Sequence, residues 1–132
     1  MRHILLTILL SHFIIGITYS QTTSEMREQA DQSYKTADAE LNGVYQQILK
    51  EYSDDTIFLE ALRTSQRNWI KFRDSELKMK YPEREPGWYG SIHPICISYY
   101  LAGLTIERTE GLKEWLTRTE EGDVCSGTIK IK

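Results

Sequence analysis

Apolar and small side chains recur at steps of three and four residues along the chain from about Ser24 to Tyr52. This spacing is typical of one face of an α-helix, and a helix over that range would be up to about 40 Å long. Ser24, Glu25 and Glu28 fit the preference of a helix N-terminus for capping and acidic side chains. The face consists of Met26, Ala30, Tyr34, Ala37, Leu41, Val44, Ile48 and Tyr52. The sequence therefore predicts one long helix.

Two further stretches show the same steps of three and four residues. The second runs from about Asp55 to Lys80, and the third begins near Ser91 or Pro94 and ends before Gly122. Their faces are marked by Phe58, Leu62, Gln66, Trp69, Phe72 or Arg73 and Leu77, and by Ile97, Leu101, Leu104, Arg108, Leu112 and Trp115. Both stretches are therefore predicted to be helices.

The connection over residues 81–90 contains two prolines and two glycines, which exclude regular structure there. Alternation typical of a β-strand is weak throughout, and the best candidate is the tail over residues 128–132. The prediction is an all-α fold: a small bundle of three main helices, with a long loop before the last helix and a C-terminal tail.

The N-terminal segment has the features of a secretory signal. Arg2 is followed by a mostly apolar run over residues 4–17, which is short for a membrane span of about 20 residues. Small residues at Thr18 and Ser20 favour cleavage after Ser20. An uncleaved membrane anchor is the alternative, and His12 within the run disfavours it. We expect a signal peptide over 1–20 and a single domain over 21–132, exported to the periplasm or the extracellular space without a stable membrane anchor.

Composition and charge narrow the classes of function. Hydrophobic residues make up 40% and charged residues 27% of the chain, a globular balance that excludes intrinsic disorder and a multi-pass membrane protein. The formal net charge of −3 argues against a nucleic-acid binder with a basic surface. Cleavage after residue 20 would remove one arginine and no acid, so the charge would change from −3 to −4.

Two cysteines, Cys96 and Cys125, lie in the predicted mature chain. In an oxidising compartment an even pair is expected to form a disulfide. A loop of roughly 30 residues would be stabilised by roughly 3.5 kcal/mol, and the bond would tether the tail. Two separate thiols are the alternative. Two cysteines and the single mature histidine, His93, are too few for a zinc site, and we expect neither a metal nor a cofactor.

Several polar residues occupy positions where the helical pattern calls for apolar ones. They are Asp38, Asn42, Gln66, Trp69, Arg73 and Arg108, with Trp69 lying between two of the polar positions. A charge on an apolar face is costly unless it is paired. We therefore expect a polar network that sets the register of the helices, with Asp38 paired to Arg73 or Arg108. The alternative is a catalytic or ligand site, but no second carboxylate is evidently placed to work with Asp38, and we do not expect an enzyme.

Four motifs along the chain resemble those of the lysozyme-inhibitor LprI family. The first two are residues 37–45, similar to the family pattern "aDaeLNxxY", and residues 66–74, similar to "aQrxWixyRD". Residues 90–92 and then 104–112 are similar to "GS…LTxxR…L". The motifs occur in the family's order and spacing, and the family-like core covers residues 25–119. The resemblance implies a small secreted or lipid-anchored bacterial protein with an all-helical domain and, as partner, a lysozyme-like protein.

The cysteines depart from the family pattern. Family members often carry cysteines at the positions that match Gln29, Leu77 and Tyr100 here, whereas this chain has Cys96 one helical turn before the last of these and Cys125 in the tail. The disulfide framework has therefore been rebuilt or lost.

The loop before the third helix holds the residues best suited to a partner. Arg84, Trp88, Tyr89 and His93 supply hydrogen-bond donors and aromatic rings, and arginine and aromatic residues are typical interface anchors. Alternatively, Trp88 and Tyr89 fold back on the helix core, and His93 only begins the helix. Three classes of function remain: a secreted inhibitor of a lysozyme-like glycosidase, an envelope interaction or stress module with another partner, and an unrecognised enzyme.

Overall fold

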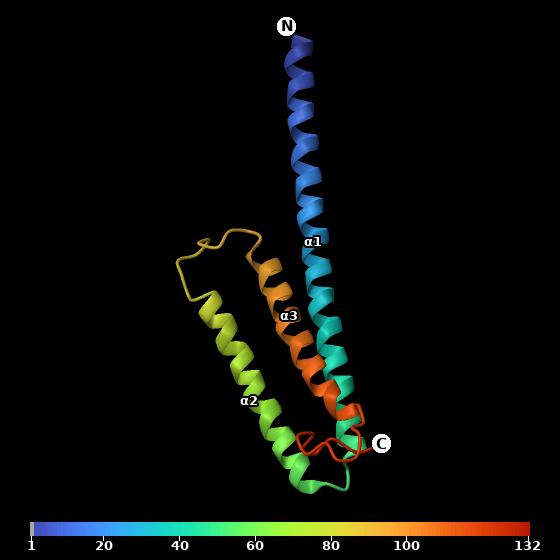
Figure 1. Cartoon of the computed structure of the whole chain (residues 1–132). Helices are drawn as coiled ribbons and strands as arrows, with labels where there is room; N and C mark the ends of the chain where they lie inside the picture. Colours follow the sequence, from blue (N-terminus) through green and yellow to red (C-terminus); the bar gives the residue numbers. More distant parts are fainter. Residues whose placement is uncertain (1) are drawn as a thin grey trace.

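The structure is a computed structural model that describes residues 2–132, with side chains from residue 22 onward. It contains α1 (Arg2–Glu51), α2 (Thr56–Lys80), α3 (His93–Lys113) and the short 3-10 helix η1 (Glu114–Leu116). α1 and α3 run side by side in the same direction, while α2 returns in the opposite direction and diverges from α1 (Figure 1). The predicted all-α bundle of three helices with a long loop before the last is confirmed. The third helix ends at Lys113 rather than close to Gly122.

The predicted signal peptide over residues 1–20 lies outside the residues whose side chains are described, so it stays a prediction. Among the described residues, none of the helices combines the length and the apolar character that a membrane span requires.

Small side chains line the interface between α1 and α3. Ala30 and Ala37 are buried on α1, and Ala102 and Thr105 are buried on α3. Because these side chains are short, the two helix backbones can approach closely. The Thr105 hydroxyl donates to the carbonyl oxygen of Leu101 at 2.7 Å, so its burial leaves no unmatched donor. This interface holds α1 and α3 together over most of the length of α3.

The buried face of α3 differs from the predicted one by a rotation about the helix axis. The sequence pattern placed Leu101, Leu104 and Arg108 on the core face, but these residues are only partly buried. The buried residues are Ile95, Ser98, Ala102, Thr105, Thr109 and Leu112. Small and hydroxyl side chains face α1, and Arg108 instead reaches toward α2. Hydrophobicity alone could not find this face, because serine and threonine are counted as polar.

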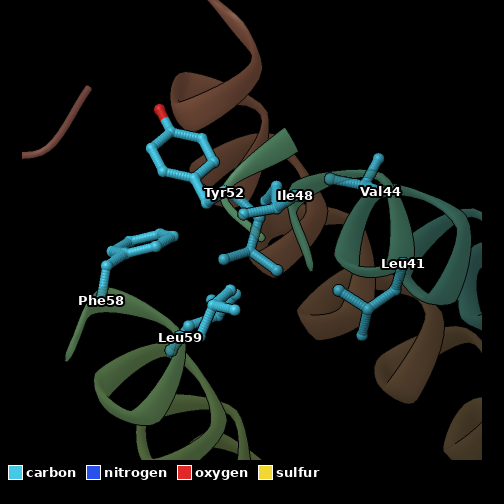
Figure 2. Packing of buried hydrophobic residues seen from close by; sticks show 8 residues of the cluster. Leu41, Val44, Ile48, Tyr52, Phe58 and Leu59 are labelled. Carbon is cyan, nitrogen blue, oxygen red and sulfur yellow. The ribbon is translucent and has the colours of Figure 1, made fainter. Parts of the chain in front are cut away.

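The main apolar core lies where α1 turns into α2. Ile48 of α1 and Tyr52, just after its end, meet Phe58 and Leu59 of α2 (Figure 2). Leu62 of α2 and Leu112 of α3 belong to the same cluster. The rings of Tyr52 and Phe58 are 4.6 Å apart between centroids. The Asp55 carboxylate caps α2 by accepting from the backbone N–H of Phe58 at 2.9 Å, which fixes the start of the helix. The buried residues of α2 all lie in its first two turns.

The C-terminal tail folds over this corner. Tyr52 is 1% exposed, and its hydroxyl donates to the carbonyl oxygen of Trp115 at 3.0 Å and accepts from the backbone N–H of Lys130 at 3.1 Å. The indole Nε1 of Trp115 donates to the Thr128 hydroxyl at 3.0 Å. Thr119 and Ile131 form an isolated parallel β-bridge, so the weak strand candidate at 128–132 contributes only a single bridge. The tail is held by Tyr52 and Trp115.

The predicted disulfide between Cys96 and Cys125 is absent, and both thiols are free. Cys96 lies in the first turn of α3, and the tail leaves from the last turn. The helix rise between Cys96 and Lys113 is about 26 Å, whereas a disulfide requires Cα atoms about 4.4–6.8 Å apart. The tail docks at the α1–α2 corner, beside the end of α3 from which it leaves (Figure 1). The expectation was wrong because it assumed that the tail returns along α3.

The hydroxyl of Tyr52 should contribute measurably to stability. Replacing Tyr52 with Phe leaves the Trp115 carbonyl and the Lys130 N–H without their partner, and we expect the free energy of unfolding to fall by about 1–3 kcal/mol. Urea denaturation followed by circular dichroism measures this. Tyr99→Phe is the matched control, because Tyr99 is 49% exposed and its change should have no effect. Equal stability of the two variants would show that the tail is not held through Tyr52.

A second substitution tests the free thiols. Cys125 is exposed, so Cys125→Ser should change the free energy of unfolding of the unreduced protein by no more than about 0.5 kcal/mol. If the two cysteines were joined, the same change would cost roughly 3.5 kcal/mol. The experiment compares the parent and the variant in urea with and without reductant. A large loss in the free energy of unfolding that is confined to the unreduced samples would show that Cys96 and Cys125 are joined.

Candidate functional site

The loop between α2 and α3 lies at the end of the bundle opposite the core corner (Figure 1). Gly87 and Gly90 adopt positive φ angles of 85° and 72°, a conformation that side chains with a Cβ rarely adopt. Pro94 stands in the first turn of α3, where its missing N–H has no helical partner to lose. Two glycine turns and a proline-led helix therefore set the path of the loop.

An aromatic cluster attaches this loop to the helix ends. The ring of Tyr89 stacks on His93 with centroids 4.4 Å apart, and Tyr81 meets His93 at 4.8 Å and Tyr89 at 5.5 Å. The Tyr89 hydroxyl donates to the carbonyl oxygen of Pro82 at 2.7 Å. Burial, and then the nearby thiol of Cys96, raise the pKa of Tyr81, so its phenol stays neutral at physiological pH. Tyr89 and His93 thus face inward and hold the loop.

Arg84 and Trp88 face solvent instead. Trp88 is 67% exposed, and the Cζ of Arg84 lies 5.5 Å from the centroid of its ring. A guanidinium over an indole face is a favourable cation–π pair. The pair offers five N–H donors beside an apolar surface, which suits a carboxylate flanked by an apolar or sugar face. The four residues predicted for partner contact therefore divide into an exposed pair and an inward pair.

The predicted polar network divides as well. Arg108 donates from Nε to the Gln66 side-chain oxygen at 3.1 Å, and the Cζ of Arg73 lies 5.4 Å from the ring centroid of Trp69. These contacts lie between α2 and its neighbours or along α2. Asp38 accepts from the side-chain amide of Asn42 at 3.1 Å, one turn away on α1. The structure therefore brings Arg108 to Gln66 and Arg73 to Trp69. Asp38 and Asn42 contact each other on α1 and are not joined to these residues.

The ion pair expected between Asp38 and an arginine does not form among the described residues. Arg73 is paired with the adjacent Asp74 at 2.8 Å, and its remaining nitrogen donates to the Tyr34 hydroxyl on α1 at 3.4 Å. Arg108 uses the side chains of Gln66 and Ser65. The expectation failed because each arginine finds its partners on α2: Asp74 for Arg73, and Gln66 and Ser65 for Arg108.

Two contacts at this end of the molecule were missed from the sequence. The first is Tyr81, which lies at the centre of the aromatic cluster. Its only signal in the sequence is its place directly before Pro82, where the second helix has to end. The second is the Ser98 hydroxyl, which donates to Asp31 at 2.6 Å across the α1–α3 interface. The sequence does not indicate this contact, because a serine on a helix face can point to solvent as well as to a neighbouring helix. Within the described part of the chain, no group of three or more histidine, cysteine, aspartate or glutamate residues could hold a metal ion.

Comparison with known proteins gives two matches. The family model described as "Lysozyme inhibitor LprI" matches residues 17–112, a range that includes all four sequence motifs and the whole loop. A protein of Rhizobium meliloti (strain 1021) described as "Uncharacterized protein R02472" is 39% identical over 102 residues, covering 69% of this chain and 71% of its own length. No solved structure matches the chain significantly.

The separate placement of Asp38 makes a testable difference. Because its described partner is the exposed side chain of Asn42, Asp38→Ala should lower the free energy of unfolding by about 1 kcal/mol or less. A buried ion pair would instead make the loss about 3–5 kcal/mol. Urea denaturation measures the change, and Asn42→Ala serves as control because it removes the same bond from the other side. A loss in the larger range for Asp38→Ala alone would show that an arginine pairs with it.

Proposed function

This chain belongs to the LprI family of lysozyme inhibitors, and we propose that it is an exported protein that binds a lysozyme-like glycosidase and blocks its cleft. The export follows from the signal peptide expected over residues 1–20. Inhibition by binding needs no catalytic group, and we propose no catalytic activity for this chain.

The observation that carries the proposal is the exposed pair of Trp88 and Arg84 on an anchored loop. The loop joins the ends of α2 and α3 on the side away from the core corner (Figure 1), where a partner can contact it. Glycosidase clefts hold a pair of carboxylates and surfaces that bind sugar rings. The Arg84 guanidinium would donate to such a carboxylate, and the Trp88 ring would occupy a sugar-binding surface.

Charge supports the same partner. The chain has a formal net charge of −3, which favours encounter with a basic protein through long-range attraction. Glu83 and Glu85 flank Arg84 in the loop, so the guanidinium is presented within an acidic surrounding. Basic residues around the cleft of a partner would meet these two glutamates while Arg84 meets the cleft carboxylate.

A lysis assay tests the proposal. The purified exported protein is added to lysozymes of different structural classes, and the clearing of a bacterial cell suspension is followed by turbidity. We expect slower lysis with at least one lysozyme. Trp88→Ala and Arg84→Ala should each raise the half-inhibitory concentration at least tenfold, about 1.4 kcal/mol, because anchors of this kind dominate interface energetics.

Matched substitutions on α2 serve as controls. Phe72 is 54% exposed and Arg63 is exposed, so Phe72→Ala and Arg63→Ala remove the same kinds of side chain away from the loop and should leave inhibition unchanged. Helix content, measured by circular dichroism, should be equal in all four variants. Inhibition that survives the double change of Arg84 and Trp88 would move the contact surface to the exposed side of α1. Unaltered lysis with every lysozyme would favour an envelope interaction module with another partner.

A further inference from the structure

An open apolar groove lies at the other end of the molecule, between the first turns of α2 and the last turns of α3. Its volume is about 510 Å³, within the range of about 300–1,000 Å³ typical of small-molecule sites. The apolar lining consists of Ile57, Phe58, Ala61, Leu62, Leu112 and Trp115. Phe58, Leu62 and Leu112 are buried at its base, whereas Ile57 is 84% exposed at its rim. The groove therefore joins the apolar core to solvent.

One cation, Arg108, lines this apolar groove. Its Nε donates to Gln66 and one terminal nitrogen donates to the Ser65 hydroxyl at 3.0 Å, and both of these acceptors are neutral. Within the described part of the chain, no carboxylate lies in ion-pair distance of Arg108, whereas Arg73 pairs with one carboxylate and Lys113 with two. Burial lowers the pKa of the Arg108 guanidinium, which is the effect of a charge that is partly desolvated and not compensated.

The other polar groups of the groove already have partners. Asp55 accepts from the N–H of Phe58 as the cap of α2, and the Thr128 hydroxyl accepts from the indole of Trp115. Through that bond the tail closes one end of the groove beside Trp115. What remains available to a ligand is an apolar surface and the free donors of Arg108, while the negative charge of Asp55 disfavours an anionic head group at its own end of the groove.

We propose that this groove binds an amphiphile with a single apolar chain and one anionic head group, with the chain along Phe58, Ala61 and Leu62 and the head at Arg108. Charge complementarity selects this occupant: the apolar lining takes the chain, and the uncompensated guanidinium takes a carboxylate or a phosphate in two parallel hydrogen bonds. The head group could come from a free fatty acid or from a single-chain phospholipid. The site is distant from the loop of Arg84 and Trp88, so this proposal stands independently of lysozyme inhibition.

Two-dimensional NMR of the indole N–H signals tests the proposal at the site itself. Trp115 lines the groove, while Trp88 lies in the loop at the opposite end and is the internal control. The probes are dodecanoate, dodecyl phosphate, dodecanol and dodecyltrimethylammonium, each below its micelle concentration. We expect the two anions to shift the Trp115 signal in a saturable manner without moving that of Trp88. Dodecanol should bind at least tenfold more weakly than the better anion, and the cation more weakly still. The tighter of the two anions identifies the source of the head group.

Two substitutions separate the roles of charge and groove. Arg108→Gln should weaken binding of the better anion about tenfold or more and leave that of dodecanol unchanged. Ala61 is exposed on α2, so Ala61→Trp should fold normally and fill the groove, and it should weaken dodecanol and the anions alike. Ala39→Trp, at an exposed position of α1, is the matched control and should bind as the parent does. This set keeps the test decisive even if Arg108→Gln is unstable.

The proposal is overturned if none of the four probes shifts the Trp115 signal. It is equally overturned if dodecyltrimethylammonium binds as tightly as the anions, since Arg108 would then have no role. Unchanged anion binding by Ala61→Trp would place the ligand outside the groove, and a Trp88 shift parallel to that of Trp115 would show nonspecific adsorption.

Discussion

The interface between α1 and α3 consists largely of alanine, serine and threonine side chains, and the arrangement of the rest of the molecule depends on it. Short side chains allow close contact between the two helices, and their hydroxyls find acceptors within the interface, as Ser98 does on Asp31. Helices packed in this way leave α3 with one face for α1 and another face for α2. α2 can then meet a large apolar surface only at the corner, where Tyr52, Phe58 and Leu112 are available.

The divergence of α2 from α1 follows from that limit. Beyond Leu62, Trp69 still packs against the core. Farther along, α2 is joined to α1 and α3 by long polar side chains, such as Arg73 to Tyr34 and Tyr100 to Glu76. Such contacts tolerate a wider helix separation than aliphatic packing does, because a guanidinium or a tyrosine spans the gap. The apolar groove beside Arg108 lies between the first turns of α2 and the last turns of α3, where Phe58, Leu62 and Leu112 line it.

The sequence pattern predicts the three helices, the irregular loop and the family, because each leaves a local signal: steps of three and four, prolines with glycines, and four motifs in order. It fails where the outcome depends on which helices become neighbours. On α3, Ala102 and Thr105 are buried, whereas Leu104 is only partly buried. A close helix pair requires small residues, and a pattern based on hydrophobicity does not identify them. The disulfide between Cys96 and Cys125 and the pairing of Asp38 failed in the same way. Both required knowledge of where the tail and α2 lie.

The loop illustrates how one short segment combines an inward and an outward set of aromatic residues. Tyr89 and His93 pack on Tyr81, so the loop loses its conformational freedom when the chain folds and not when a partner binds. Ordering a rotamer-rich interface side chain costs about 0.5–1.5 kcal/mol at binding, and the stacking of Arg84 on Trp88 reduces that cost for the two groups that face solvent. In the proposed complex, substituting the inward residues would therefore weaken binding through disorder of the loop, whereas substituting Trp88 would remove contact area alone. The distinction explains why the exposed pair, and not the whole loop, is the informative place to change the protein.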